Sequence, residues 1–407
     1  FFSLRVCGDE KNCQKDPEGR QLEVMVKRYL MTGMTPNPGG VEAYIMNLVR
    51  HIDPEKVQFD YLVNYEEVIA YEQELRTMGA DIIRLPGRRK HPVAHQTVYR
   101  KFFKNAGERY DGIYCNLLSL ANIDDLTYAK KNKINRIIAH SHNSNDTGWD
   151  LMGIRKRLHQ THQKELDQYA EKLFACSNMA GWFMFGENAN FEVIHNAIDA
   201  ERFCFSQEKR NQIRTQLKIS PDTRLYGTVG RLEEQKNPGF ILDVFRCLHE
   251  KDPECRFIHV GDGSLRGEIE KKIGEYGLEK AYLITGVVND TSGYYQAMDA
   301  FIFPSLYEGL PVALIEAQAA DLPCFLTDTI SDETKIVEEN YHKIPLNGGA
   351  QTWAETILGI NGLNGGHRAE AVPTIATGRR NVSERVKAAG YDITQAAKQM
   401  EEYLYYG

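Results

Sequence analysis

Hydrophobic residues follow two different periods along this chain. Short apolar runs that end in glycine or polar residues recur through the sequence. Between them, apolar residues return every three to four positions, as on one face of a helix. This spacing is clearest at Val41–Ile52, where Val41, Tyr44, Ile45, Leu48, Val49 and Ile52 form one stripe. Alternation of buried strands with helices predicts parallel sheets that are covered by helices on both faces.

The predicted strands fall into two groups. The first group contains Val26–Thr32, Phe59–Asn64, Asp81–Leu85, Gly112–Asn116, Ile134–Ala139 and the strand and loop Lys172–Asn178. The second group contains Leu225–Gly230, Arg256–Val260, Tyr282–Thr285 and Phe301–Phe303. Because 407 residues are too many for one compact domain, the two groups predict two α/β domains.

Composition and charge narrow the class of protein. Hydrophobic residues make up 42% of the chain and charged residues 26%, which is ordinary for a globular protein with two cores. A net charge of −7 argues against a nucleic-acid-binding protein, so no nucleic acid is expected as a partner. We find no run of about 18 apolar residues, so the sequence predicts no transmembrane helix.

The eight cysteines are scattered and form no pair at metal-ligand spacing, so the sequence predicts no zinc site. Cys115, Cys176 and Cys324 lie in apolar stretches and are predicted to be buried thiols of a reduced, cytoplasmic protein. Residues 1–24 lack the pattern of a signal peptide. We treat them as an extension of unknown role.

The segment Phe301–Pro323 reads as a buried strand, a tight loop and a helix. Pro311 suits the first helical position, where a missing N–H costs nothing. The amides of Gly309 and Leu310 would then point out of the carboxyl end of the strand, where an α/β fold holds anions. An ordinary surface loop that leads into a structural helix is the alternative. Glu308 lies before this helix start.

Other polar turns follow the predicted strands of the second domain. Arg231 and Lys236 follow Leu225–Gly230, the turn Gly261-Asp262-Gly263 follows Arg256–Val260, and Gly286-Val287-Val288 follows Tyr282–Thr285. Carboxyl ends of parallel strands share one edge of the sheet, so these turns should converge with Glu308 and with Glu316 of the following helix. An exposed loop pair is the alternative reading of Arg231 and Lys236.

Two loops of the first domain complete the pattern. Gly39 and Gly40 close a glycine-rich loop between the first strand and its helix, but the loop lacks Gly-x-Gly-x-x-Gly, which disfavours a dinucleotide site. The fifth strand leads into His140-Ser141-His142-Asn143. We expect the two histidines to point to opposite faces and only one of them to face a ligand, with a structural histidine as the alternative for each.

The spacing Glu308-x7-Glu316, with Gly-Leu-Pro after the first glutamate, resembles the donor-site signature of the retaining GT-B glycosyltransferases of family 4. Three further sets of residues are similar to motifs of that family, which includes bacterial capsular and exopolysaccharide enzymes. They are Gly39-Gly40-x-Glu42, Arg231 with Lys236, and Gly261-Asp262-Gly263. The resemblance covers roughly residues 25–405. It implies two Rossmann-like domains that face each other across a cleft, and a C-terminal helix that crosses back to the first domain.

The resemblance also implies a division of the chain and roles for its residues. We expect an acceptor domain at 25–200, joined by the helix 385–407, and a donor domain at 201–384. Among the catalytic residues, Arg231 and Lys236 would clamp the diphosphate of a nucleotide sugar, and Glu308 and His142 would contact the sugar. The donor-binding set would comprise Gly39, Gly40, Asn143, Gly261, Gly286, Val288, Gly309, Leu310, Pro311 and Glu316, with Glu316 on the ribose.

No Asp-x-Asp motif occurs in the sequence, so we expect no metal and no cofactor. The resemblance implies transfer of a hexose from a nucleotide diphosphate sugar; a UDP-sugar is the donor we expect, and the sequence leaves the choice between UDP and GDP open. A retaining glycosidase would use paired glutamates but would leave the basic pair and the glycine loops unexplained. A non-catalytic sugar-nucleotide-binding homologue and a GT-B-fold epimerase stay as alternatives. The family's Ile-Pro-Asn-Gly turn reads Ile194-His195-Asn196-Ala197 here, a departure that bears on the turn alone.

The acceptor is expected to be a glycan or a lipid-linked glycan. Arg88-Arg89-Lys90, Arg100–Lys104 and Arg155–Arg157 gather basic charge in the first domain. One interpretation is peripheral contact with the inner face of the plasma membrane, and the other is a solvated charged face. Gly348–Gly378 is weakly patterned, and Asn381–Tyr406 is helical with a break at Gly390-Tyr391-Asp392.

Overall fold

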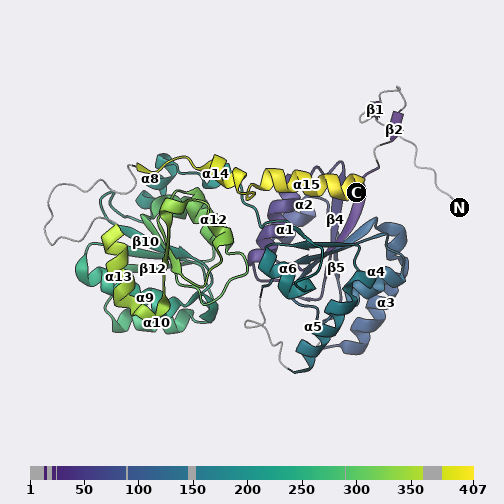
Figure 1. The fold of residues 1–407 in the computed structure, drawn as a ribbon, viewed down its shortest axis with the longest axis horizontal. Coiled ribbons are helices and arrows are strands. Elements are labelled where there is room, and N and C mark those ends of the chain that lie inside the picture. Colours follow the sequence, from purple (N-terminus) through teal and green to yellow (C-terminus); the bar gives the residue numbers. More distant parts are fainter. Residues whose placement is uncertain are drawn as a thin grey trace.

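The computed structural model describes residues 25–88, 90–144, 153–288, 290–360 and 378–407, and two short upstream strands. These strands, β1 (Cys13–Lys15) and β2 (Gln21–Glu23), pair antiparallel. The rest of the predicted extension at 1–24 lies outside the described residues. From residue 25 onward the chain forms two lobes that lie side by side, each built on a parallel sheet with helices around it (Figure 1).

The first lobe contains a seven-stranded sheet in the order β5-β4-β3-β6-β7-β8-β9 among the described residues. Its strands are β3 (Lys27–Thr32), β4 (Val57–Val63), β5 (Ile82–Arg84), β6 (Gly112–Leu117), β7 (Arg136–Ser141), β8 (Lys172–Ala175) and β9 (Glu192–Val193). Its helices are α1 (Gly40–His51), α2 (Glu72–Thr77), α3 (Pro92–Arg109), α4 (Asp124–Lys131), α5 (Ile154–Glu165), η1 (Leu166–Gln168) and α6 (Asn178–Phe185). The predicted strands are confirmed to within about two residues.

Alternation along the strands separates two hydrophobic clusters. In β3, Tyr29 and Met31 pack into the cluster that contains residues of α1 and of the C-terminal helix, whereas Leu30 packs into the cluster on the opposite face. Phe103 of α3 belongs to that second cluster. Successive side chains of a strand point to opposite faces, so a sheet buried on both faces needs an almost continuous apolar strand.

The second lobe contains a six-stranded parallel sheet in the order β12-β11-β10-β13-β14-β15 among the described residues. Its strands are β10 (Leu225–Val229), β11 (Arg256–Val260), β12 (Tyr282–Gly286), β13 (Ala300–Phe303), β14 (Cys324–Thr327) and β15 (Tyr341–Ile344). Its helices are α7 (Ala200–Phe203), α8 (Gln207–Gln216), η2 (Glu234–Lys236), α9 (Pro238–Lys251), α10 (Arg266–Glu275), α11 (Ser292–Ala297), α12 (Val312–Ala319), η3 (Asp332–Thr334), η4 (Glu338–Asn340), η5 (Leu346–Gly348) and α13 (Gly349–Ile360).

The far edge of this second sheet was not predicted from the sequence. Neither β14 nor β15 was expected, and Gly348–Gly378 was expected to be weakly patterned although α13 opens that stretch. Trp353 anchors α13, because its side chain is fully buried and packs against Phe240 of α9. Residues 361–377 lie outside the described residues.

The C-terminal segment links the two lobes, as expected. Helix α14 (Ser383–Ala388) packs against α7 and α12 of the second lobe, and α15 (Ile393–Tyr406) lies over the first lobe beside α1 (Figure 1). The Tyr29 hydroxyl donates to the Leu404 carbonyl oxygen at 2.8 Å, and Lys56 forms an ion pair with Glu401 of α15 at 2.6 Å. These contacts secure the crossing helix to β3 and to the residue before β4, both in the interior of the first sheet.

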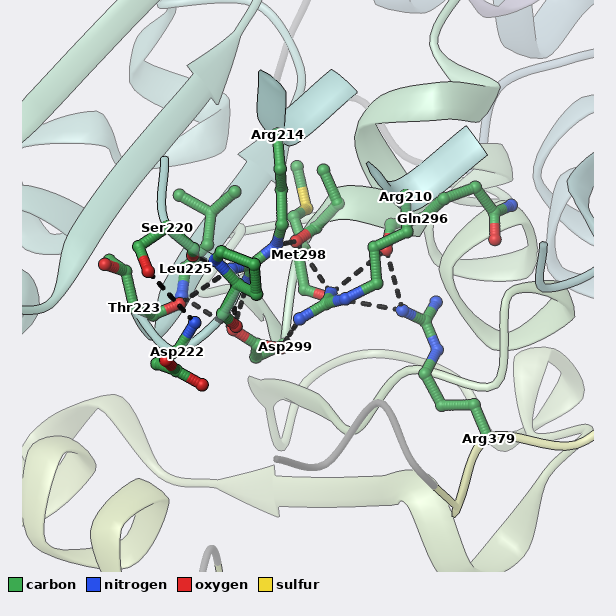
Figure 2. Close-up of polar contacts among 12 residues, drawn as sticks. Arg210, Arg214, Ser220, Asp222, Thr223, Leu225, Gln296, Met298, Asp299 and Arg379 are labelled. Atoms are coloured by element: carbon green, nitrogen blue, oxygen red, sulfur yellow. Dashed lines mark hydrogen bonds and ion pairs between the residues drawn. The ribbon is translucent and has the colours of Figure 1, made fainter. Parts of the chain in front are cut away.

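A buried arginine cluster supports the strand that leads to the predicted donor loop. Arg210 and Arg214 of α8 both donate to Asp299, at 2.6 and 2.7 Å, immediately before β13 (Figure 2). Arg379 reaches the same turn from the C-terminal segment and shares the carbonyl oxygens of Gln296 and Met298 with Arg210. The cluster therefore ties α8, the start of β13 and the C-terminal segment together.

The three predicted buried thiols are confirmed: Cys115, Cys176 and Cys324 are all buried and unpaired.

The turn at 194–197 departs from the family's motif, with Ala197 in place of a glycine. Ala197 is buried and its φ is not positive, so the replacement of the glycine causes no backbone strain there. None of the helices within the described ranges is both long and apolar enough to cross a bilayer.

Candidate functional site

The predicted site residues gather where the carboxyl edges of the two sheets meet. The loop after β7 contacts the loop after β13, because the Ser144 hydroxyl donates to the Glu308 carbonyl oxygen at 3.1 Å. A Cβ on Gly309 would lie 3.5 Å from the carbonyl oxygen of His142. His142 and Glu308, which are far apart in sequence and come from different lobes, therefore lie beside the same contact.

Lys236 and Glu308 form an ion pair in this region. Lys236 Nζ lies 2.5 Å from Glu308 Oε1, and the exposed fractions of the two side chains are 18% and 8%. The ammonium group also lies 5.0 Å from the centroid of the Phe303 ring at the end of β13. The pair is internally neutral, so Lys236 is not a free cation before a ligand binds.

Gln235 joins the same two loops and was not predicted from the sequence. Its side-chain N–H donates to the Tyr307 carbonyl oxygen at 3.0 Å and to Glu308 Oε2 at 3.3 Å. The backbone carbonyl oxygen of Gln235 accepts from the Leu306 N–H at 2.9 Å. Glu308 is therefore held by two neighbouring side chains of one short helical turn. Proximity to Lys236 in the sequence was the only available signal for this role.

Arg231 lies at the end of β10 with its side chain exposed. Within the described part of the chain its guanidinium group makes no hydrogen bond and no ion pair, while its carbonyl oxygen accepts from the Glu233 N–H at 2.9 Å. The Ser264 N–H and hydroxyl donate to the Glu233 carboxylate at 2.9 and 2.7 Å and lower its pKa, and the charge of Arg231 adds to this shift. Arg231 thus keeps its guanidinium donors available at the carboxyl edge of the second sheet.

Glycines let two neighbouring loops approach each other behind Arg231. Gly261 has φ +144°, and a Cβ there would lie 2.1 Å from the Gly230 carbonyl oxygen. A Cβ on Gly263 would lie 2.4 Å from the carbonyl oxygen of Leu232. Any side chain at either position would displace the backbone on both sides of Arg231, which explains the spacing of the Gly-Asp-Gly turn.

Gly286 ends β12 and forms a bridge with Gly261, so these two predicted residues are adjacent. Its φ of +74° favours glycine. Val288 is partly buried and packs against the hydrophobic core, which leaves its backbone as the part that could contact a ligand. These turns follow one another along the same sheet edge.

The helix after β13 begins one residue later than predicted. Pro311 is the N-cap of α12 and has extended backbone angles, so it is not the first helical residue. The Leu310 side chain is buried, with 8% exposed, and belongs to the core. The backbone amides of Gly309 and Leu310 make no hydrogen bond to the part of the chain that the structure describes. Their availability matches the prediction.

Glu316 lies inside α12, where the Tyr295 hydroxyl donates to its Oε2 at 2.7 Å. Burial raises the pKa of Glu316 to about 7, and the hydrogen bond from Tyr295 opposes this shift. A carboxyl group that is partly protonated at neutral pH, and whose other oxygen has no donor among the described residues, can accept from ligand hydroxyls once it ionises.

The glycine-rich loop of the first lobe ends at α1. Gly39 is the N-cap of this helix, and Gly40 has open space where a Cβ would be. Glu42 is buried and accepts from the Thr35 hydroxyl at 2.5 Å, which fastens the loop to the helix. The loop therefore has a fixed backbone and an open surface at Gly40.

His140 and His142 point to the same face, so the expectation of opposite faces is wrong: residues two apart on an extended chain share a face. Strand β7 ends at Ser141, and the centroids of the two imidazole rings lie 4.1 Å apart with the ring planes tilted by 32°. His142 Nε2 bonds Asn116 Oδ1 at 2.9 Å, and His140 Nδ1 bonds the Tyr114 hydroxyl at 2.7 Å. Burial lowers the pKa of both histidines, so both rings are neutral at pH 7.

Asn143 faces another loop, since its side-chain amide donates to the Leu118 carbonyl oxygen at 3.1 Å.

Among the described residues there is no group of three or more histidine, cysteine, aspartate or glutamate side chains that could hold a metal ion. Taken together, the described residues of the site offer a guanidinium group and two backbone amides without hydrogen-bond partners among them, an ion pair and a neutral imidazole. Such a set suits an anionic ligand that also carries hydroxyl groups.

Comparison with known proteins assigns this geometry to a family. Residues 209–360 match the family model described as glycosyl transferases group 1. The chain is 30% identical over 373 residues to glycosyltransferase EpsF of Bacillus subtilis (strain 168), covering 90% of this chain and 93% of EpsF. It is 25% identical over 330 residues to the capsular polysaccharide biosynthesis glycosyltransferase CapH of Staphylococcus aureus, covering 79% and 87% of the two chains.

Solved structures show the same fold. The structure of HepE from Anabaena in complex with UDP and glucose superimposes with a TM-score of 0.67 at 18% identity, covering 93% of this chain and 99% of HepE. The two parallel sheets with a crossing C-terminal helix are therefore the GT-B architecture. Together with the match to EpsF over nearly its full length, this establishes that the chain belongs to the glycosyl transferases group 1 and is a glycosyltransferase.

Proposed function

We propose that this protein is a retaining, metal-independent hexosyltransferase. It would move a hexose from a UDP-sugar to a glycan or lipid-linked acceptor during surface polysaccharide synthesis. The observation that carries the proposal is the position of Arg231, the Lys236–Glu308 pair and Gly309 around one junction of the two lobes. The polysaccharide setting is suggested by the name of CapH, and UDP by the ligand of the HepE structure.

Metal independence is supported by the charges available for the diphosphate. Arg231 is free to pair with a phosphate group, and Lys236 can do so by exchanging one oxygen of Glu308 for one of the ligand. A charge-assisted hydrogen bond contributes about 1.5–3 kcal/mol, compared with about 0.3–1 kcal/mol for a helix terminus. The two cations should therefore dominate diphosphate binding, with the amides at Gly309 and Leu310 adding to it.

Retention is the stereochemistry that the resemblance to the retaining GT-B family implies, and the engaged carboxylates of the site disfavour a covalent route to it. Glu308 is engaged by Lys236 and Gln235, and Glu316 by Tyr295, within the described residues. We therefore expect the acceptor hydroxyl to attack from the face that the diphosphate leaves. Glu308 would hold sugar hydroxyls, and the leaving phosphate would be stabilised by Arg231.

A lipid-linked acceptor is supported by the surface of the first lobe. Lys101 and Lys104 of α3 are exposed, and Ile154 at the start of α5 is 75% exposed beside Arg155 and Lys156. Of the other predicted basic cluster, Arg88 pairs with Asp124 at 3.1 Å, whereas Arg89 lies outside the described residues. Basic residues next to an exposed apolar side chain favour contact with an anionic membrane surface.

The donor is tested first by calorimetry. The protein is titrated in EDTA with UDP, GDP and ADP and with their common sugar conjugates. We expect UDP to bind, and Arg231→Ala to weaken UDP about tenfold or more, the loss of one charge-assisted bond. Lys271→Ala is the matched control, because Lys271 is a 77% exposed cation on α10. Binding that requires added Mg²⁺ would contradict metal independence.

Transfer and stereochemistry are tested with the donor that binds. Radiolabelled sugar should pass to a lipid-linked glycan in EDTA, and the anomeric configuration of the product should equal that of the donor by NMR. An inverted product would refute retention while leaving the donor site intact. Release of an altered sugar nucleotide without any acceptor would instead favour an epimerase.

Membrane contact is tested by cosedimentation. We expect binding to vesicles that contain phosphatidylglycerol at low salt, reduced in Lys101→Glu/Lys104→Glu and unaffected in the control Lys271→Glu. Equal sedimentation with neutral vesicles, or none with anionic ones, would remove this part of the proposal and leave the donor assignment untouched.

A further inference from the structure

A cavity of about 420 Å³ lies at the start of α3, and its size is typical of a ligand pocket. Its walls are formed by Arg88, in the loop after β5, and by α3 from Pro92 to Arg100. Strand β5 is the outermost strand of the first sheet, and β4, β3 and β6 separate it from β7. Four strand spacings, roughly 19 Å, therefore lie between β5 and the strand that leads to His142. The cavity is thus separate from the loops of the candidate donor site.

Arg100 contributes an oriented guanidinium group to the wall of this cavity. Its Nε–H donates to the Tyr128 hydroxyl oxygen at 3.0 Å, and the Gln96 side-chain N–H donates to the same oxygen at 2.7 Å. Within the described residues, the two Nη groups of Arg100 have no hydrogen-bond or ion-pair partner. Tyr128 therefore holds the guanidinium group in one orientation while its outer donors stay available for a ligand.

The charge of the cavity wall is positive. Arg88 is its second cation, and it pairs with Asp124 at 3.1 Å while its side chain remains 51% exposed. Glu66 of the loop after β4 is matched by Lys90 at 3.9 Å. None of the described residues that line the cavity carries a carboxylate. The cavity therefore suits an anionic group.

His95 forms a buried part of the same wall, with 3% of the residue exposed. Its Nδ1 bonds the Pro86 carbonyl oxygen at 2.8 Å, and its ring stacks on that of Tyr99 with centroids 5.5 Å apart. The Tyr99 hydroxyl donates to Asp125 at 2.6 Å, so this carboxylate already has a donor. These contacts fix the inner wall before any ligand binds.

The surface of α3 around the cavity extends its positive charge. Val93, Thr97, Arg100, Lys101 and Lys104 are all exposed, and their spacing of three, four and seven residues places them along one face of the helix. Lys101 and Lys104 continue the cationic surface away from the cavity, and Val93, which is 79% exposed, adds an apolar side chain at its rim. An anionic group that is attached to apolar chains matches both features.

We propose that this cavity binds the phosphate group of an anionic membrane lipid, held by the two Nη groups of Arg100. A guanidinium group can donate to two phosphate oxygens at once, whereas the ammonium group of a lysine acts as a point charge. Lys101 and Lys104 then attract the membrane without selecting a headgroup. The inference rests on the membrane contact in the proposed function and deepens it, because it adds a defined subsite to a charged surface.

Arg100→Lys separates a phosphate subsite from general attraction, since it keeps the charge and removes the planar pair of donors. The probe is a vesicle of phosphatidylcholine and phosphatidylglycerol, and the partition coefficient is measured by cosedimentation at low salt. We expect Arg100→Lys to lower this coefficient about tenfold, the loss of one charge-assisted hydrogen bond. Lys101→Arg, the reverse exchange on the same face of α3, should change it less than about twofold, because it keeps the charge.

The source of the phosphate is tested with glycerol 1-phosphate in solution. Calorimetry is done with saturating UDP, so that the donor site is occupied. We expect weak binding that Arg100→Lys lowers about tenfold. If Arg100→Lys weakened glycerol 1-phosphate but left vesicle binding unchanged, the cavity would be a site for a soluble phosphate ester, and the lipid assignment would be overturned.

The remaining outcomes distinguish this inference from the proposed function. Equal vesicle binding by Arg100→Lys and the unaltered protein would overturn the phosphate subsite and leave the general membrane contact standing. No binding of the unaltered protein to anionic vesicles would overturn both. A protein that binds no UDP would overturn the proposed donor, while the vesicle comparison would still decide the role of Arg100. Because Arg100 is exposed, its variant should unfold at the same temperature as the unaltered protein, which excludes misfolding as the cause of a loss.

Discussion

Lys236 Nζ and Glu308 Oε1 lie 2.5 Å apart in the absence of a ligand, so the main predicted phosphate-binding lysine is already neutralised by the predicted sugar-binding glutamate. Both side chains are largely shielded from solvent. Donor binding must therefore redistribute an existing ion pair. This coupling has a measurable consequence for a substitution of Glu308, which would ordinarily be expected only to harm the enzyme.

Glu308→Gln should separate binding of the diphosphate from transfer of the sugar. Removing the carboxylate charge frees Lys236 for the diphosphate, so UDP should bind about fivefold tighter, the equivalent of a partly exposed ion pair. Transfer should fall about 100-fold or more because the sugar loses a group that holds it in the transition state. Calorimetry with UDP and a radiolabel transfer assay measure the two quantities.

Glu275→Gln is the matched control for this prediction. Glu275 pairs with Lys271 at 3.6 Å on the exposed face of α10, so its loss should change neither quantity. If Glu308→Gln weakened UDP binding, Glu308 would have to position Lys236 for the phosphate and not compete with it.

Donor affinity should depend on pH through Glu316. The pKa of this carboxyl is about 7 in the folded protein and 4.5 ordinarily, because burial disfavours its charged form. If the ionised carboxylate accepts ribose hydroxyls, UDP affinity should rise about tenfold between pH 6 and pH 8. Titration calorimetry across that range tests this, and Glu316→Gln should remove the dependence.

Stability without ligand should move in the opposite direction. A carboxyl whose pKa is raised by folding binds its proton more tightly in the folded state, so its favourable contribution to the free energy of unfolding is lost as pH rises from 4.5 toward 7.

Tyr295→Phe removes the hydrogen bond to Glu316 Oε2 and should shift the midpoint of the pH-dependent change in UDP affinity upward. A midpoint that stayed in place would mean that another group titrates.

Much of the fold, and the proximity of several residues of the candidate site, was predictable from the sequence, because parallel strands place their carboxyl ends at one edge. Knowing only that Arg231, Gly261 and Glu308 each follow a strand was enough to bring them together. Pairing of Lys236 with Glu308 was not predictable, since it depends on side-chain rotamers and on Gln235 bracing the glutamate. Residue spacing carries no information about either.

The errors have local physical causes. The expectation of opposite faces for His140 and His142 was wrong because residues two apart on a strand share a face, and the centroids of the two rings lie 4.1 Å apart. Pro311 caps α12 from outside, although proline is equally suited to the first helical position.

Gly261→Ala should reduce both stability and UDP affinity. A methyl group there would lie 2.1 Å from the Gly230 carbonyl oxygen, and φ is +144°, so the backbone before Arg231 must move. We expect a loss of about 1–3 kcal/mol in the free energy of unfolding, typical of overpacking, together with weaker UDP binding. Denaturant unfolding and calorimetry measure these changes.

Gly267→Ala provides the opposite expectation with the same substitution. Gly267 lies inside α10, and nothing is found within 4 Å of where its Cβ would be. Alanine should stabilise that helix by about 0.5–1 kcal/mol and leave UDP affinity unchanged. Equal effects of the two variants would show that the close approach at Gly261 is not required.

Asp299→Asn should destabilise the second lobe strongly, because Asp299 is the carboxylate that Arg210 and Arg214 share. The side chains of the two arginines are 3% exposed and that of Asp299 is 7% exposed, so each charge is removed from water (Figure 2). Loss of the carboxylate would leave two buried guanidinium groups with only carbonyl oxygens and neutral amide groups, which should lower the free energy of unfolding by about 3–5 kcal/mol.

Asp252→Asn is the control. The Arg224–Asp252 pair has the same composition and a similar distance, 2.9 Å, but its side chains are 30% and 24% exposed. It should cost less than about 1 kcal/mol. Guanidinium unfolding of both variants compares the two pairs directly, and similar losses would contradict the view that burial makes this cluster the anchor of β13.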